Sequence, residues 1–266
     1  MKYLSDRNTF SFSGISQVET VDKILDVLEL YLKHEGELSV SELASLSGLS
    51  VSRTYRIASS LARRGYLRQK EKRAKYSVGL KLLEYSSVIQ HNLRIAELAL
   101  PLLQKLSRAC GESVNVTILD SYEALSVAQV EVNRLFRVST PVGMKLPLYA
   151  TSSGKILLAH MVEIERKQFY DTRHLISYTK NTTVSSDKLE EELEIIKRDG
   201  VAFDNGEYDP SIWSVAAPVY NSDGNVIAGV AIVAPLARIS EDKVGSLIEL
   251  NRNSALEIST EMGYAV

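Results

Sequence analysis

The 266-residue sequence predicts an α+β protein in which a helical N-terminal part precedes an antiparallel sheet flanked by helices. Three observations predict this fold. Two short helical segments meet at a glycine between residues 39 and 64, basic residues concentrate between residues 51 and 80, and the alternation typical of strands recurs after residue 112. The length allows two domains, and 45% hydrophobic with 24% charged residues is ordinary for a globular protein.

The first ordered element is expected to be a helix from Ser16 to about Tyr31. Ser16 and Glu19 form a capping box. The apolar residues of this helix recur at steps of three and four, at Val21, Ile24, Leu25, Leu28 and Leu32. Residues 1–14 contain no apolar block typical of a signal peptide, so we expect a disordered tail there.

Two further helices follow, joined by a tight turn. Ser39 and Glu42 form a second capping box, Gly48 ends the first of these helices, and Ser50 is the expected N-cap of the second. One face of the second helix is expected to be buried, with Thr54, Ile57, Ala58 and Leu61. This pattern is typical of a helix-turn-helix.

A short basic hairpin is expected after Gly65, with strands at about Tyr66–Gln69 and Lys75–Val78. This hairpin would form a wing and complete a winged helix-turn-helix domain at residues 15–78. Residues 51–80 contain nine Lys or Arg and one acidic residue, a net charge of +8, although the whole chain carries −2. Such a concentration of positive charge often means only a solvated basic face. Here it coincides with the helix-turn-helix pattern and continues into the hairpin, so we predict binding to double-stranded DNA.

Nine residues of this domain are predicted to contact DNA, and two roles are assigned to seven of them. Arg53, Tyr55 and Arg56 are expected to face base edges, and Arg63, Arg64, Lys72 and Arg73 to hold phosphates. The complete set is Ser52, Arg53, Tyr55, Arg56, Ser59, Arg63, Arg64, Lys72 and Arg73.

Residues 79–92 are expected to form a linker helix. Its apolar residues are too numerous for a helix that contacts only solvent: Leu80, Leu82, Leu83, Tyr85, Val88 and Ile89. We therefore expect this helix to join two copies of the chain into a homo-oligomer.

Residues 93–266 are expected to form the second domain. Helices are predicted at about Leu93–Cys110, Ser153–His160, Val162–Thr172, Asp187–Arg198 and Ser240–Met262, with a kink at Pro101. Strands are predicted at about Ser113–Asp120, Leu125–Val130, Arg134–Thr140, Ser214–Tyr220 and Val226–Ala234. The turns at Asp120–Glu123 and Ser222–Asn225 favour antiparallel pairing.

Sequence patterns typical of catalysis and metal binding are missing. The four histidines are scattered, and there is no Gly-rich phosphate loop and no nucleophile elbow, so we expect no cofactor, no metal and no enzymatic activity. The single cysteine, Cys110, excludes an intramolecular disulfide, and no run approaches the roughly 18 apolar residues of a membrane span. These features predict a cytoplasmic protein that does not contact membranes.

Two alternatives from other classes remain open. A GAF-type reductase fused to a DNA-binding module would need redox cysteines, and one cysteine does not suffice. A purely architectural DNA-binding protein would leave the second domain without a task.

Three sequence blocks in order support a resemblance to the IclR family of transcriptional regulators, which extends from Ser16 to Gly263. SELASLSGLSVSRTYRIASSLARRGYL matches the family's winged helix-turn-helix, LPLYATSSGKILLA at 146–159 resembles its pocket turn and helix, and FDNGEYDPSIWSVAAPVYNSDGNVIAGVAIVAP at 203–235 resembles its C-terminal signature. The resemblance implies a GAF-like effector domain that binds a small organic or aromatic acid. It also implies a dimer or a dimer of dimers on a palindromic operator.

The family's effector contacts transfer to this chain position by position. The cysteine of many members is Ser214 here, two serines of the later strand are replaced by Ala231 and Val233, and the acidic position keeps Asp204. The complete effector-binding set that the resemblance implies is Leu135, Val138, Ser152, Ser153, Gly154, Asp204, Trp213, Ser214, Ala231 and Val233.

The altered hydroxyl pattern predicts a ligand whose shape or orientation differs from that in relatives. Asp204 favours a hydroxy or keto acid such as a sugar acid, because a carboxylate suits a ligand hydroxyl. Trp213 favours an aromatic acid as the alternative. We therefore expect a ligand-responsive repressor of a catabolic operon.

Overall fold

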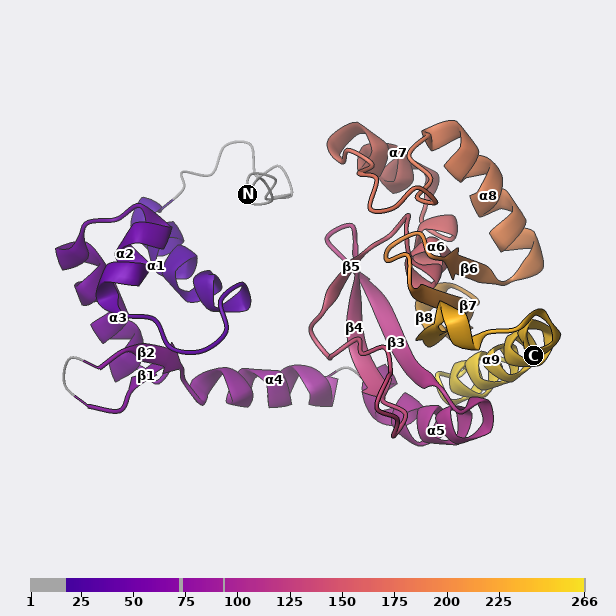
Figure 1. The fold of residues 1–266 in the computed structure, drawn as a ribbon, viewed down its shortest axis with the longest axis horizontal. Coiled ribbons are helices and arrows are strands. Elements are labelled where there is room, and N and C mark those ends of the chain that lie inside the picture. The colour runs from indigo at the N-terminus through magenta and orange to yellow at the C-terminus, as the bar shows by residue number, and fades with distance from the viewer. Residues whose placement is uncertain (1–17, 72–73, 93, 266) are drawn as a thin grey trace. The chain divides into compact units, whose positions relative to one another are not determined.

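The computed structural model describes residues 18–71, 74–92 and 94–265 (Figure 1). The expected disordered tail at 1–14, the capping residue Ser16 and the expected phosphate contacts Lys72 and Arg73 lie outside the described residues. The chain divides into two compact units, Met1–Asn92 and Leu93–Val266.

The described part of the N-terminal unit consists of helices around a small core, a two-stranded sheet and a further helix. Its elements are α1 (Glu19–Glu29), a 3₁₀ turn (Leu30–Leu32), α2 (Val40–Ser47), α3 (Val51–Arg63), β1 (Leu67–Gln69), β2 (Tyr76–Val78) and α4 (Lys81–Asn92). The buried core contains Val27, Leu43, Ile57, Ala58, Leu61, Leu67 and Tyr76.

Local sequence determines the turn between α2 and α3. The Ser39 hydroxyl accepts a hydrogen bond from the Glu42 N–H at 3.2 Å, and the Ser39 N–H donates to the Glu42 carboxylate at 2.7 Å, which confirms this capping box. Gly48 has a φ of 68°, a left-handed conformation that glycine adopts without steric cost. The predicted buried face of α3 is confirmed, with Thr54, Ile57, Ala58 and Leu61 inside.

The predicted inner face of α1 is partly wrong. Val21 and Leu25 are largely exposed and Leu32 is 85% exposed, whereas Val27 is fully buried. α1 begins at Glu19 and gives way to a 3₁₀ turn after Glu29, so the regular helix is shorter than predicted. Because apolar residues occupy more than one side of this segment, their spacing did not specify which side faces the core.

In the C-terminal unit, the described residues form one six-stranded antiparallel sheet with the order β5-β4-β3-β8-β7-β6. The strands are β3 (Ser113–Asp120), β4 (Glu123–Val130), β5 (Lys145–Pro147), β6 (Ala202–Asn205), β7 (Ile212–Tyr220) and β8 (Val226–Pro235). The helices are α5 (Arg94–Cys110), α6 (Ser152–Ala159), α7 (Glu163–Thr172), α8 (Ser186–Asp199) and α9 (Glu241–Glu261).

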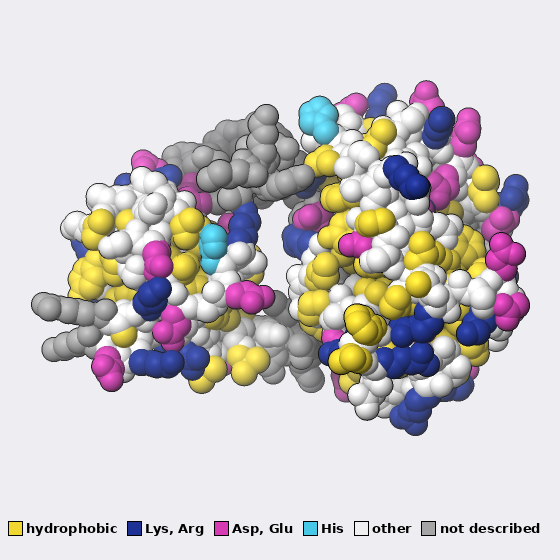
Figure 2. All heavy atoms as spheres, viewed as in Figure 1, with side chains coloured by type: hydrophobic (Ala, Val, Ile, Leu, Met, Phe, Trp, Pro, Cys, Tyr) yellow, Lys and Arg dark blue, Asp and Glu magenta, His cyan; other side chains and the backbone are white. Residues whose placement is uncertain are grey.

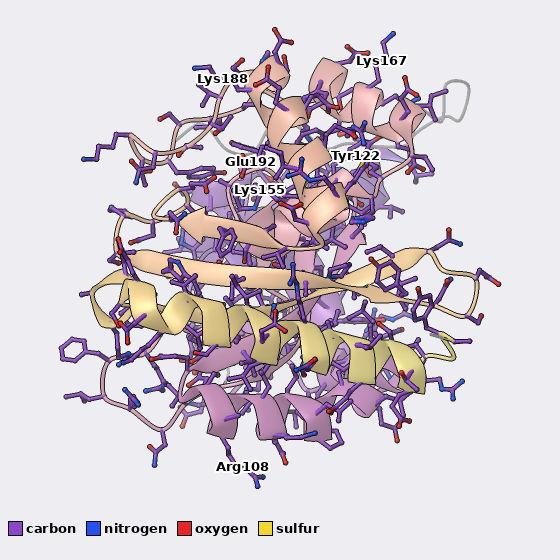
Figure 3. The ribbon with its side chains drawn as sticks, turned by 90° about the vertical axis from the view of Figure 1, so that its right-hand side faces the viewer. Arg108, Tyr122, Lys155, Lys167, Lys188 and Glu192 are labelled. Atoms are coloured by element: carbon purple, nitrogen blue, oxygen red, sulfur yellow. The ribbon has the colours of Figure 1, made fainter. Side chains whose placement is uncertain are left out.

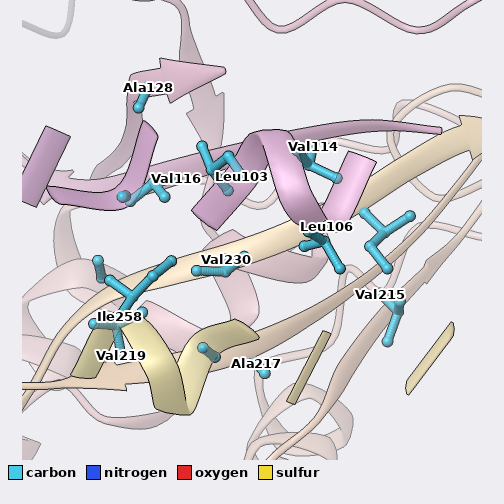
Figure 4. Close-up of a cluster of buried hydrophobic side chains, with 14 of the residues drawn as sticks. Leu103, Leu106, Val114, Val116, Ala128, Val215, Ala217, Val219, Val230 and Ile258 are labelled. Atoms are coloured by element: carbon cyan, nitrogen blue, oxygen red, sulfur yellow. The ribbon is translucent and has the colours of Figure 1, made fainter. Parts of the chain in front are cut away.

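Each face of the sheet is covered by its own helices and has its own core. On the first face, α5 and α9 pack against strand residues such as Val116 and Val230, and Ile258 is one of the α9 residues in this core (Figure 4). On the second face, α6 packs against smaller strand residues that include Ala216 and Ala231, and residues of α7 and α8 extend the same core. The second face therefore has less side-chain volume near its strands.

The predicted strand at Arg134–Thr140 is wrong. This segment is irregular, and its polar residues bond through side chains: the Thr140 N–H donates to the Gln129 side chain and Ser139 donates to Glu131. The short strand β5 pairs with β4 instead. β5 and β6, the two edge strands, were not predicted, because segments of three and four residues are too short to display alternation.

Candidate functional site

The exposed side of α3 carries most of the predicted DNA contacts. The side chains of Ser52, Arg53, Tyr55, Arg56, Arg63 and Arg64 are all exposed. Ser59 is half-buried, and its hydroxyl lies 3.4 Å from the hydroxyl of the buried Tyr76. Ser59 therefore contacts the wing, and less of it is accessible than of the other six residues.

Acidic side chains partly compensate the basic residues of this unit, and both kinds lie on the face of the unit that Figure 2 shows. Ion pairs join Arg53 to Glu19 at 3.8 Å and Lys70 to Glu37 at 3.1 Å. Lys75 pairs with Glu42 at 3.1 Å. These pairs are exposed, so each contributes little stability and leaves the cation available to a polyanion.

The pKa of Glu42 is lowered to about 2. The largest causes are its hydrogen bonds with the Ser39 backbone and hydroxyl, and the contact with Lys75 lowers it further. Glu42 therefore remains a carboxylate over the physiological pH range. Within the described chain, Arg56, Arg63 and Arg64 form no ion pair with an acidic side chain. These three guanidinium groups form the uncompensated part of the surface.

Two tyrosines connect the wing to α4. The rings of Tyr66 and Tyr85 are stacked with their centroids 6.0 Å apart, and their hydroxyls are hydrogen-bonded at 2.9 Å. A Cβ added at Gly79 would lie 2.0 Å from the Gly65 carbonyl oxygen, so only glycine fits this crossing. The start of α4 is thus fixed to the wing by packing and by a hydrogen bond.

The described apolar side chains of α4 are largely exposed in the single chain. Leu83 is 67% exposed and Val88 59%, whereas Leu82 is half-buried; Leu80, which directly precedes α4, is 70% exposed. The side chain of Ile89, which was predicted to extend this face, lies outside the described ones.

A small cavity lies on the second face of the C-terminal sheet, with a volume of about 50 Å³. Seven of its lining residues were predicted as effector contacts: Val138, Ser152, Ser153, Asp204, Ser214, Ala231 and Val233. The strand register explains their convergence, because Ser214 lies opposite both Val233 and Asp204 in the sheet. Residues at alternate positions of paired strands share one face.

The other three predicted effector contacts do not line this cavity. Leu135 is 91% exposed. Trp213 is buried in the core of the opposite sheet face, where its ring packs against Phe203 at 6.3 Å, because it precedes Ser214 by one strand position. Gly154 has a packing role, since an added Cβ would lie 2.6 Å from the Pro147 carbonyl oxygen.

Several cavity residues were not predicted as effector contacts. They are Asn115, Ser139, Thr140, Met144, Leu146, Thr151, Tyr208 and Ile212. Asn115 lies opposite Ala231 in the sheet, so a correct strand register would have identified it. Ser139 and Thr140 were assigned to a strand that does not form, and that error concealed their position.

Two hydroxyls bridge α6 and β7 at the cavity wall. Ser152 Oγ and Ser214 Oγ are 2.7 Å apart and hydrogen-bonded, and both residues are buried. Thr151 occupies the N-cap position of α6, but its hydroxyl donates to the Pro147 carbonyl and makes no cap bond. The first N–H groups of α6 have no partner inside the helix, as at any helix start, and they suit an anion.

Asp204 is the buried carboxyl group of the cavity, and it is 2% exposed. Its Oδ1 accepts the Glu207 N–H at 2.7 Å. Burial raises the pKa of Asp204 to about 7, although the Glu207 N–H and Lys155 act in the opposite direction. Asp204 is therefore a mixture of protonated and ionised forms near neutral pH.

A buried ion cluster lies beside Asp204. Lys155 is fully buried, and its Nζ donates to Glu192 at 2.6 Å and to both Glu207 oxygens at 2.7 and 2.9 Å. Figure 3 shows Lys155 and Glu192 next to each other near α8. The cluster joins α6, α8 and the loop after β6, so it stabilises one wall of the cavity.

A larger groove of about 530 Å³ lies between α8, β6 and α9. Its polar groups are already engaged: Arg252 pairs with Glu249 at 3.3 Å and donates to the Asp199 carbonyl at 2.6 Å, and Glu192 binds Lys155. The groove contains none of the predicted effector contacts. The smaller cavity is therefore the better candidate.

No group of three or more His, Cys, Asp or Glu side chains in the described ranges is arranged to hold a metal ion. Among the helices that the structure describes, none combines the length and apolar character required to cross a membrane.

Known proteins resemble this chain over most of its length. Residues 20–71 match the profile of the IclR helix-turn-helix domain, and residues 87–260 match that of the bacterial transcriptional regulator IclR C-terminal domain. HTH-type transcriptional regulator KipR of Bacillus subtilis is 31% identical, over 92% of this chain and 98% of its own length. Transcriptional repressor IclR of Escherichia coli is 28% identical, over 93% of this chain and 91% of its own length. The crystal structure of the Thermotoga maritima IclR superposes with a TM-score of 0.78 at 31% identity, and covers 93% of this chain and 100% of the other.

Proposed function

Because the chain belongs to the IclR family of transcriptional regulators, we propose that it is a repressor whose affinity for a DNA operator changes when a small organic acid binds its C-terminal unit. The family consists of regulators, not enzymes. The observation that carries the proposal is the cavity in which Ser152, Ser214 and the buried Asp204 converge. It occurs in the same chain as a helix with uncompensated guanidinium groups.

The DNA contacts follow from the exposed side of α3. We infer that Arg53, Tyr55 and Arg56 recognise base edges in the major groove. Arg63 and Arg64, together with Lys72 and Arg73, would bind phosphates without sequence preference. The ion pair between Arg53 and Glu19 would break on binding, at little cost, because both side chains are exposed.

The cavity suits a small acid that also carries a polar group. The ligand carboxylate would bind the first N–H groups of α6 beside the Ser152 hydroxyl. Val138, Ala231 and Val233 would contact the apolar part of the ligand. Asp204, when ionised, would accept a hydrogen bond from a ligand hydroxyl, and when protonated it would donate one to a keto oxygen.

An aromatic acid is the second candidate effector. Trp213, which first favoured it, lies on the other face of the sheet, but Tyr208 provides an aromatic ring in the cavity wall. The cavity volume of about 50 Å³ favours the smaller hydroxy and keto acids.

The exposed apolar face of α4 supports a homo-oligomer, either a dimer or a dimer of dimers. Leu83 and Val88, together with Leu80 just before the helix, would be covered by α4 of a second copy. Two recognition helices related by a two-fold axis would then bind a palindromic operator with half-sites about one helical turn apart, or a multiple of that.

A thermal-shift screen of hydroxy, keto, sugar and aromatic acids tests the effector part of the proposal. An acid that binds only the folded state raises the melting temperature as the logarithm of its concentration over Kd. We expect at least one acid to do so and also to alter operator affinity. The proposal is wrong if no acid stabilises the protein, or if a bound acid leaves operator affinity unchanged.

A further inference from the structure

Asn115 is a cavity residue that no family block includes. It lies on β3, directly opposite Ala231 of β8, and is 1% exposed. Of the described residues that line the cavity, Asn115 alone has a fully buried side-chain polar atom without a hydrogen-bond partner, and that atom is Oδ1. Buried acceptors in proteins are rarely left unpaired, because desolvation without a hydrogen bond is unfavourable.

Neighbouring hydrogen bonds determine which atom of the Asn115 amide is unpaired. Gln129 Nε2 donates to the Glu131 carboxylate at 3.1 Å, so Gln129 Oε1 is an acceptor. This Oε1 accepts the Thr140 N–H at 2.9 Å and the Thr140 hydroxyl at 3.4 Å. Because the Thr140 hydroxyl donates its proton to Gln129, its oxygen acts as an acceptor. This hydroxyl oxygen accepts a hydrogen bond from Asn115 Nδ2 at 2.6 Å.

The direction of the hydrogen bond between Gln129 and Glu131 is determined because Glu131 is ionised. A hydrogen bond from Ser139 is the largest of several causes that lower the pKa of Glu131. A carboxylate has no proton to donate, so it fixes the orientation of the Gln129 amide, and through Thr140 that of Asn115. The series of bonds runs from an exposed ion pair to the buried cavity wall.

Three further polar groups of the cavity wall have partners within the protein. Ser152 and Ser214 bond to each other, and Asp204 accepts the Glu207 N–H. Asn115 Oδ1 is thus an oriented acceptor to which the protein provides no donor.

We propose that Asn115 Oδ1 accepts a hydrogen bond from the effector, so that the cavity selects an acid with a hydroxyl or N–H donor over the same acid without it. This inference rests on the proposed function and narrows its effector class. Simple keto acids, which have no hydrogen-bond donor once the carboxyl group is ionised, are placed below hydroxy acids. Asn115 is therefore a specificity-determining residue of the effector site.

Matched pairs of acids test this selectivity by isothermal titration calorimetry of the full chain. Suitable pairs are glycolate and methoxyacetate, lactate and 2-methoxypropionate, and 4-hydroxybenzoate and 4-methoxybenzoate. For the pair that fits the cavity, the hydroxy acid is expected to bind wild type about 10-fold to 100-fold more tightly than its methyl ether. In Asn115→Leu the ratio of the two Kd values is expected to fall toward 1, because the Asn115 acceptor is gone and only Asp204 can still accept from the hydroxyl.

Asn251 provides a matched control. It lies on α9, is also 1% exposed, and has its Nδ2 bonded to the carbonyls of Val215 and Val230 while its Oδ1 is unpartnered. Asn251→Leu should keep the wild-type ratio of Kd values. Thr140→Val is a second test variant, since it removes the acceptor that orients the Asn115 amide, and its ratio should also fall.

The outcomes separate this inference from the proposed function. Equal affinity of wild type for both acids in every pair, or a ratio that is unchanged in Asn115→Leu and Thr140→Val, overturns the role of Asn115 and leaves the effector site standing. A ratio that falls equally in Asn251→Leu also overturns it, because the effect would then be a general loss of packing. If neither these acids nor those of the thermal-shift screen bind wild type, the proposed function fails and the inference fails with it.

Discussion

Replacing Asp204 by Asn is expected to stabilise the C-terminal unit at about pH 8 and to leave its stability nearly unchanged at about pH 4. Asp204 is 2% exposed, and burial raises its pKa from 3.8 to about 7. The folded state therefore retains a proton that the unfolded state loses. Asp204 reduces stability progressively as the pH rises between these two values, and the full penalty is present above the folded pKa.

The size of this penalty follows from the two pKa values. The difference between 3.8 and about 7 corresponds to roughly 4 kcal/mol in the free energy of unfolding, which is an upper limit. Asn in place of Asp204 keeps an oxygen that accepts the Glu207 N–H, so the variant removes the charge without removing that bond.

Urea unfolding measured through Trp213 fluorescence at a series of pH values tests this prediction. Trp213 is the only tryptophan and is buried in the C-terminal unit, so its emission reports the unfolding of that unit. Asp209→Asn is a control with the opposite sign, because hydrogen bonds from Ser211 lower the pKa of Asp209 and its charge stabilises the fold above that pKa. Asp204 does not destabilise the fold through its charge if Asp204→Asn is no more stable than wild type at about pH 8. The same follows if the gain in the free energy of unfolding is as large at about pH 4 as at about pH 8.

Three further predictions concern the DNA surface, the ion cluster and α4. Arg53→Ala is expected to cost about 1–3 kcal/mol of operator affinity and to relax sequence preference. Arg63→Ala should weaken binding to all DNA sequences alike and lower the slope of log affinity against log salt concentration by about 1. Equal losses of affinity for operator and random DNA in anisotropy titrations of both variants would contradict this division of roles. Lys155→Met is expected to lower the free energy of unfolding by about 3–5 kcal/mol, because Glu207 is left buried without its cation. The double variant with Glu207→Leu should recover part of the loss. Urea unfolding that shows Lys155→Met to be as stable as wild type would rule out this role of the ion cluster. Leu83→Asp is expected to shift sedimentation toward the monomer, and an unchanged sedimentation coefficient would place the oligomer contact elsewhere.

Local signals predicted the N-terminal unit well. The capping box at Ser39, the left-handed Gly48 and the buried face of α3 all depend on residues within one or two helical turns of each other. The opening helix was predicted less well, because the residue that is fully buried, Val27, is not part of the spacing used to define its inner face.

The cavity depended on strand pairing over long distances, which a single sequence specifies poorly. Ser214 and Trp213 are adjacent in sequence, yet one lines the cavity and the other lies in the core of the opposite face. Asn115 became identifiable only from its register with Ala231. Because residues 134–140 follow an irregular path, Leu135 is exposed to solvent and Thr140 lines the cavity.

We propose that one acid, bound in the cavity of the C-terminal unit, changes the affinity of the protein for its operator. The most direct measurement is fluorescence anisotropy of an operator duplex selected from random sequence, titrated with wild type and with Ser152→Val at increasing effector concentration. We predict that saturating effector changes the operator Kd of wild type by about 5-fold to 150-fold, and that Ser152→Val binds operator normally but requires more effector for the same change. If the operator Kd of wild type stays constant at saturating effector, then binding of the acid does not control the affinity for DNA.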